Sequence, residues 1–195
     1  SFQGAKTKIE VNLAYTALSL WTEGEVRARM DHVAMVFARS CPNLELVVAQ
    51  IIEVESLDLQ DFHKDIDIST AEQMITIRSL FRNPLRPILM YVRNVEKSPL
   101  KARAYTLKGP RHLVRFLGSR YLNNAGYAFS PGSMEDLPNE VALKIHGTAV
   151  IADGISTNPA SRKPHRFFTE PSLTDAHELG HILLNDSSHT DDMNN

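Results

Sequence analysis

Cysteine is scarce in this sequence. The 195 residues include a single cysteine, Cys41, so no disulfide can form within the chain. The fold must therefore rest on a hydrophobic core and on any bound metal. Cys41 follows an apolar helical segment and precedes Pro42, which favours a buried structural thiol over a nucleophile. A single cysteine does not indicate whether the protein works in an oxidising or a reducing compartment.

An excess of charge of one sign is also lacking. The formal net charge is −2, with 21 basic and 23 acidic residues, so the charge balance does not indicate binding to nucleic acid or to an anionic membrane. No apolar run approaches the roughly 20 residues that cross a bilayer, and the first residues do not resemble a signal peptide. We therefore expect no nucleic-acid partner and no membrane span, while the oligomeric state stays open.

The composition is that of an ordinary globular protein. Hydrophobic residues make up 43% of the chain and charged residues 23%, and the sequence has no internal repeat or low-complexity tract. A chain of this length can bury a substantial core. We expect residues 1–195 to form a single domain.

Hydrophobic periodicity predicts alternating strands and helices before the C-terminal segment. Alternation of β-forming residues predicts strands, and apolar residues three and four apart predict helices. The predicted elements are strands at 8–20, 43–54 and 88–92, helices at 25–39 and 69–81, and β-type sequence at 140–153. The initial strand, helix and strand predict a parallel crossover. We expect an α/β (α+β) fold with a mixed twisted sheet and a backing helix.

A further helix is predicted near the C-terminal end, running to about Leu184. Ser172 can cap this helix, and Asp175, three residues later, completes a capping box and favours the positive helix end. Within the helix, residues 177–181 read HELGH, which is the H-E-x-x-H pattern.

This pattern suits zinc chemistry. His177 and His181 lie four residues apart on one helix face, so both imidazoles can bind one ion. Glu178 flanks such an ion and can act as general base toward a water that zinc has acidified. The alternative is an ordinary amphipathic helix with solvated polar residues, but the helical placement, the cap and Gly180 favour the zinc site.

A catalytic zinc site usually has three protein ligands and a water. No glutamate follows Glu178 in the sequence, and His189, eight residues after His181, is the best candidate for the third ligand. The polar segment 185–188 can turn the chain back toward the metal, because Asn185 tolerates the left-handed conformation that ends helices. The alternatives are an exposed histidine at this position and a carboxylate ligand from Asp186, Asp191 or Asp192.

The segment HELGHILLNDSSH at 177–189 resembles the metzincin clan of zinc peptidases, whose usual motif is HExxHxxGxxH. The resemblance implies that His177, His181 and His189 are the first, second and third ligands and that Glu178 is the base. It also implies a metzincin-like fold with a C-terminal active-site helix, a Zn²⁺ cofactor and a polypeptide substrate.

The sequence departs from the family motif at two places. The interval between the second and third ligands is two residues longer, and Leu184 stands where the family has glycine, with Asn185 available to make the turn. The resemblance implies a Met-turn beyond Asn195, because Met193 follows the third ligand too soon.

Metzincins bind substrate antiparallel along an edge strand of the sheet. The counterpart predicted here is the strand formed by Thr148, Ala149, Val150, Ile151 and Ala152.

Other functions fit the same residues. The segment AHELGHILL also resembles the small intracellular peptidases that cleave phage-type repressors, although those proteins place the motif earlier and contain more helix. A catalytically silent zinc domain that binds a partner protein is an alternative of another class, but Glu178 has no purpose in a purely structural site. Metal-assisted hydrolysis of a substrate other than a peptide is a third option.

Overall fold

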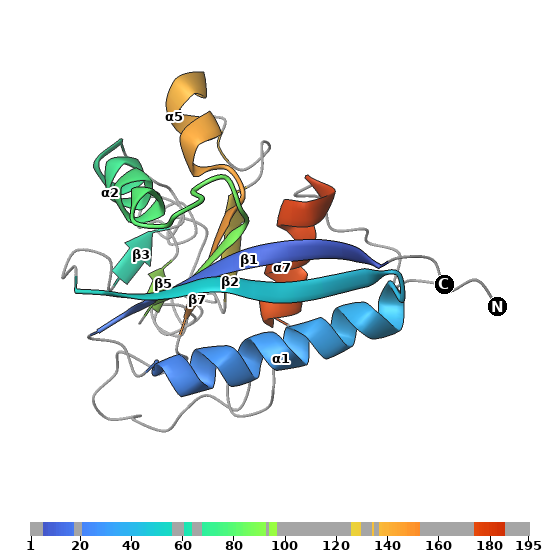
Figure 1. The fold of residues 1–195 in the computed structure, drawn as a ribbon. Coiled ribbons are helices and arrows are strands. Elements are labelled where there is room, and N and C mark those ends of the chain that lie inside the picture. The colour runs from blue at the N-terminus through green and yellow to red at the C-terminus, as the bar shows by residue number, and fades with distance from the viewer. Residues whose placement is uncertain are drawn as a thin grey trace, which may run out of the picture.

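The computed structural model describes residues 6–17, 21–55, 61–63, 68–92, 94–96, 126–129, 134, 137–152 and 174–185. These residues form a mixed α/β fold with a five-stranded sheet, a two-stranded sheet and four helices (Figure 1). Among the described helices, none has both the length and the apolar character that crossing a membrane requires.

The larger sheet has the strand order β2-β1-β4-β7-β6. Its first four strands are parallel, and the last is antiparallel to its neighbour. They are β2 (Leu44–Val54), β1 (Thr7–Thr16), β4 (Ile88–Val92), β7 (Thr148–Ala152) and β6 (Gly126–Phe129). The predicted strands at 43–54 and 88–92 and the parallel crossover between the first two strands are confirmed. The smaller sheet pairs β3 (Asp61–His63) with β5 (Asn94–Glu96).

Helix α1 (Glu23–Ser40) confirms the predicted amphipathic helix. It begins with a capping box, in which the Thr22 side chain accepts the backbone N–H of Glu25 while the Glu25 carboxylate accepts that of Thr22. Its buried residues Val26, Met30 and Val33 recur at helical spacing and face the sheet. The crossover helix thus covers the strands that it connects.

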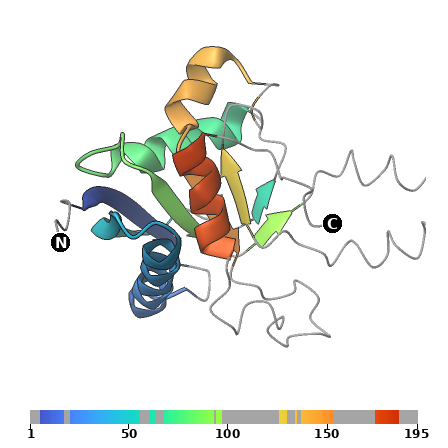
Figure 2. The ribbon, with the colours of Figure 1, turned by 90° about the vertical axis from the view of Figure 1, so that its right-hand side faces the viewer.

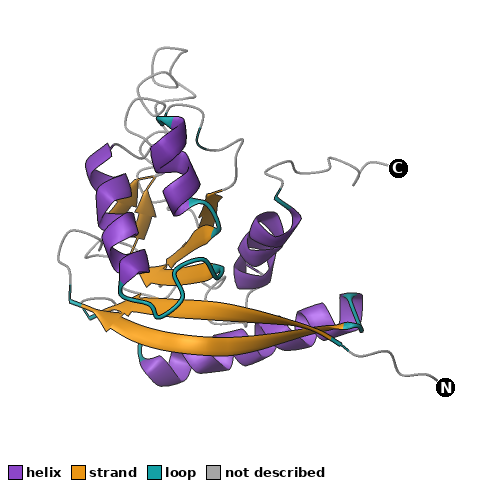
Figure 3. Ribbon diagram, turned by 45° about the horizontal axis from the view of Figure 1, so that its top comes forward, coloured by secondary structure: helices purple, strands orange, loops and turns teal. Residues whose placement is uncertain are grey.

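Helices cover both faces of the sheet (Figure 3). Successive residues of a strand point to opposite faces, and in β4 the residues on both faces are apolar and buried. One core lies between the sheet and helices α2 (Ile68–Ser79) and α5 (Asn139–Ile145), and includes Ile88, Met90 and Val92 of β4. The other core lies between the opposite face, α1 and α7 (Thr174–Leu184), and includes Leu89 and Tyr91.

Two local predictions are wrong. The sequence from 140 was expected to have β character, but Asn139–Ile145 is helical, because Val141 and Ile145 lie one helical turn apart and pack into the same core. Cys41 is an exposed free thiol and not a buried one, because it lies at the C-cap of α1, where its backbone N–H bonds Phe37. The predicted helix at 69–81 corresponds to α2 and is confirmed.

Candidate metal centre and active site

Helix α7 carries the HELGH residues and stands against one face of the sheet, beside β6 (Figure 2). Ala176, Leu179 and Ile182 are buried and pack into the core that α7 shares with α1. This apolar stripe leaves His177 exposed and His181 partly exposed. The predicted helix is confirmed to Leu184, whereas its predicted cap, Ser172, lies outside the described residues.

The two histidines of the motif are brought together. Their Nε2 atoms are 3.0 Å apart, and the ring centroids are 4.5 Å apart with planes at 83°. Two nitrogens that bind one zinc ion at about 2.05 Å and a tetrahedral angle lie roughly 3.3 Å apart. The observed separation of 3.0 Å is therefore close to the separation that two ligands of one zinc ion need. In both histidines the candidate ligand atom is Nε2.

Glu178 occupies a different environment from the histidines beside it. The residue is only 9% exposed and lies where α7 packs closely on β6. A Cβ built on Gly126 of β6 would lie 2.9 Å from Glu178 Cγ and 3.0 Å from Thr174 Cγ2. The stem of Glu178 therefore occupies the space that a side chain at position 126 would need, and the close packing requires glycine.

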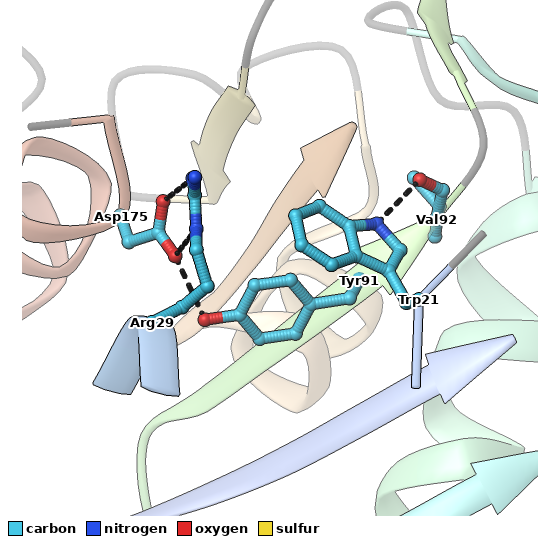
Figure 4. Close-up of polar contacts among 5 residues, drawn as sticks. All are labelled: Trp21, Arg29, Tyr91, Val92 and Asp175. Atoms are coloured by element: carbon cyan, nitrogen blue, oxygen red, sulfur yellow. Dashed lines mark hydrogen bonds and ion pairs between the residues drawn. The ribbon is translucent and has the colours of Figure 1, made fainter. Parts of the chain in front are cut away.

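The first turn of α7 is tied to the rest of the molecule by the Asp175 carboxylate (Figure 4). Arg29 of α1 donates to it from Nε at 3.0 Å and also from Nη2. Tyr91 of β4 donates its hydroxyl to the same carboxylate at 2.9 Å. The side chain of Asp175 is 1% exposed, so its carboxylate forms a buried ion pair in the first turn of α7. The predicted capping box also needs Ser172, which lies outside the described residues.

Trp21 extends this cluster toward the end of β4. Its indole N–H donates to the backbone carbonyl of Val92 at 3.1 Å, and its ring meets Tyr91 edge-on at 4.9 Å (Figure 4). The guanidinium carbon of Arg29 lies 5.3 Å from the centre of the indole, within cation–π range.

Tyr91 remains protonated in this environment. Burial raises the pKa of its hydroxyl well above the ordinary value of 10.0, and the negative charge of Asp175 and the hydrogen bond to it act in the same direction, while Arg29 opposes them. Tyr91 is thus a permanent donor to Asp175 at neutral pH.

The other end of α7 is also defined. Asn185 has φ 55°, the left-handed conformation that the sequence predicts for it at the helix end. Its side-chain oxygen accepts a hydrogen bond of 2.6 Å from Nε2 of His146, the residue that follows α5. Asn185 therefore ends α7 in a left-handed conformation directly after Leu184.

The predicted third ligand is His189. His189 lies outside the described residues, as do the alternative ligands Asp186, Asp191 and Asp192. Within the described part of the chain, no group of three or more His, Cys, Asp or Glu side chains gathers around one point. The described metal-binding candidates are therefore the pair His177 and His181.

The predicted strand Thr148–Ala152 is confirmed, but the prediction that it is an edge strand is wrong. This strand, β7, pairs with β4 on one side and with β6 on the other, so its backbone groups are engaged on both sides. The outermost described strand on this side of the sheet is β6, which the sequence analysis did not identify. Its four residues are too few for hydrophobic alternation to distinguish them from a loop.

No model of a known protein family matches the chain, and no curated protein matches it.

Proposed function

We propose that this protein is a zinc-dependent endopeptidase of the metzincin type, in which His177, His181 and His189 bind the metal and Glu178 is the general base. The observation that carries the proposal is the distance of 3.0 Å between the Nε2 atoms of His177 and His181, next to the buried residue Glu178. A mixed sheet that precedes the motif helix in the chain also supports the proposal, because the metzincin resemblance implies such an order of elements.

The donor set fits zinc. Imidazole nitrogen is a preferred ligand of this ion, and two rings held one helical turn apart require little rearrangement to share it. In the described arrangement the two Nε2 atoms lie within hydrogen-bonding distance of each other, and zinc would take the place of this contact. Bound zinc supplies a Lewis acid that lowers the pKa of a water and stabilises developing negative charge on a carbonyl oxygen.

Glu178 performs the proton transfers. It accepts a proton from the attacking water and delivers it to the amine that leaves when the peptide bond breaks. Its packing against β6 restricts its side chain, so the carboxylate needs little reorganisation during the reaction. The substrate is an extended polypeptide whose scissile bond lies beside Glu178, and therefore near Gly126 of β6 and not along β7.

The first test is cleavage of unfolded casein by zinc-loaded protein, beside Glu178→Gln and a chelator-treated sample. We expect cleavage by the wild type alone, with Glu178→Gln still binding one zinc ion. Glu72→Gln is the matched control, because Glu72 is exposed on α2, which packs on the opposite face of the sheet. Turnover by Glu178→Gln at the wild-type rate would remove the proposed base.

The third ligand is tested by zinc affinity. His189→Ala is expected to weaken zinc binding, whereas His146→Ala, which removes the histidine that bonds Asn185 at the end of α7, is expected to weaken it less. Unaltered affinity in His189→Ala would transfer the role to one of the aspartates, and weaker binding in Asp186→Ala, Asp191→Ala or Asp192→Ala would identify which.

A further inference from the structure

We propose that Arg29 and Tyr91 are positioning residues for the metal centre, acting through Asp175 to hold α7 in the orientation that presents His177, Glu178 and His181. We call Arg29, Tyr91 and Asp175 the Asp175 anchor. Its effect on zinc rests on the proposed function, whereas its effect on the helix does not.

Helix α7 needs such an anchor because it is short. It has 11 residues, and helices of this length are marginal without tertiary contacts. Its buried stripe of Ala176, Leu179 and Ile182 sets which face of the helix meets the core, but apolar contact is non-directional and fixes the rotation of the helix about its axis only loosely. A rotation of α7 would move both imidazoles and the carboxylate together.

The Asp175 anchor supplies directional hydrogen bonds that restrict the rotation of α7. The guanidinium of Arg29 approaches the carboxylate as a planar fork through Nε and Nη2, and the Tyr91 hydroxyl reaches Oδ2 from a different element (Figure 4). The three donor atoms come from α1 and β4, which are separated from Asp175 by 146 and 84 positions in the chain. One carboxylate thus fixes α7 to both elements at once.

The donors are themselves held in place. Tyr91 is fully buried, and Trp21 packs against its ring while bonding the carbonyl of the next residue, Val92. Arg29 lies over the same indole. A side chain that is held on several sides transmits its position to the group it bonds, which is how residues outside the ligand set tune a metal site.

The position of Asp175 in α7 connects the Asp175 anchor to the proposed metal ligands. Asp175 precedes His177 by two residues and Glu178 by three, so both lie within one helical turn of the fixed carboxylate. Since the ligand atoms are at the ends of long side chains, a small change in the rotation of α7 moves them further than it moves the backbone.

The test compares four forms of the full-length protein, prepared free of zinc: the wild type, Tyr91→Phe, Arg29→Lys and Arg27→Gln. Tyr91→Phe removes one hydroxyl without changing the shape of the ring, and Arg29→Lys keeps the charge but removes the fork. Arg27→Gln is the matched control, because Arg27 lies on the same helix in an exposed pair with Glu23.

Hydrogen exchange of α7 is measured first, without zinc. We expect the amides of α7 to lose protection by about 10-fold in Tyr91→Phe and Arg29→Lys, while the amides of β1 keep theirs. A role in general stability alone would lower protection in both elements equally. The emission of Trp21, the single tryptophan of the chain, is expected to change in the same two variants and not in Arg27→Gln.

Zinc affinity is then measured by competition with a chromophoric chelator. We expect about 10-fold weaker binding in Tyr91→Phe and Arg29→Lys and wild-type affinity in Arg27→Gln. Wild-type protection of α7 in both anchor variants would overturn the proposal. So would local loss of protection combined with unchanged zinc affinity. A wild type that binds no zinc would remove the proposed function, and exchange of α7 would then decide the anchoring role by itself.

Discussion

At the scale of single residues, Gly126 leaves the space that the side chain of the candidate base Glu178 occupies. A methyl group at this position would lie within about 3 Å of the side chains of Glu178, Thr174 and Ile151, closer than non-bonded carbons normally approach. The clash involves the stem of the candidate base but not the ligand atoms of His177 and His181.

Gly126→Ala is therefore expected to separate catalysis from metal binding. Displacement of the Glu178 carboxylate should lower kcat/KM by about 100-fold, while zinc affinity stays near the wild-type value. Peptide cleavage and chelator competition measure the two quantities on the same sample. Gly24→Ala is the control, because nothing lies within 4 Å of a Cβ there. Equal losses of activity in the two variants would contradict this account of Gly126.

At the scale of elements, the C-terminal end of α7 depends on a backbone conformation. Asn185 adopts φ 55°, which costs an alanine about 1 kcal/mol more than a glycine. Both substitutions remove the hydrogen bond from His146, so a comparison of the two isolates the conformational contribution.

Asn185→Ala is expected to be less stable than Asn185→Gly by about 1 kcal/mol in the free energy of unfolding. Urea denaturation of the two proteins measures this difference, and equal stability would mean that the left-handed turn is not maintained. The control is His146→Ala, which removes the same hydrogen bond without changing the conformational preference at position 185.

Several elements were predictable because their signals are local. Helix α1 repeats its apolar residues with helical period, and β4 is a short, wholly buried apolar run. Helix α5 was misread because Val141, Ala142 and Leu143 suit either type of element, and only packing shows that Leu143 is exposed while Ile145 is buried.

At the scale of the whole molecule, the raised pKa of Tyr91 links stability to pH. The folded protein holds the proton of Tyr91 above the ordinary pKa of 10.0, whereas the unfolded chain releases it there. The stability associated with this hydroxyl is therefore complete below pH 10 and is lost as pH rises toward the higher pKa of the folded state.

We expect the stability advantage of the wild type over Tyr91→Phe to shrink above pH 10. Urea unfolding of both proteins between pH 8 and pH 11 gives the difference between their free energies of unfolding. The titration of lysines and of the other tyrosines affects both proteins alike and largely cancels in this difference. A difference that stays constant across this range would show that Tyr91 titrates alike in the folded and unfolded chains.

Zinc is expected to stabilise the whole fold by mass action. A ligand that binds only the folded state at 100 times its Kd adds about 2.7 kcal/mol to the free energy of unfolding. Thermal unfolding with and without zinc should show this increase, and a chelator should reverse it. The double variant His177→Ala/His181→Ala is the control, and an increase of the same size in it would place the metal elsewhere.

Features that depend on neighbours along the chain could be predicted from the amino-acid sequence alone. The spacing of His177 and His181 brings their rings together because a helix repeats every 3.6 residues, and the left-handed turn at Asn185 follows from its own side chain. The three-dimensional fold was needed to show that β6 and not β7 is the outermost described strand, that Gly126 makes room for Glu178, and that Asp175 binds Arg29 and Tyr91. These contacts join segments far apart in sequence, and they form where packing buries both partners, which no local pattern encodes.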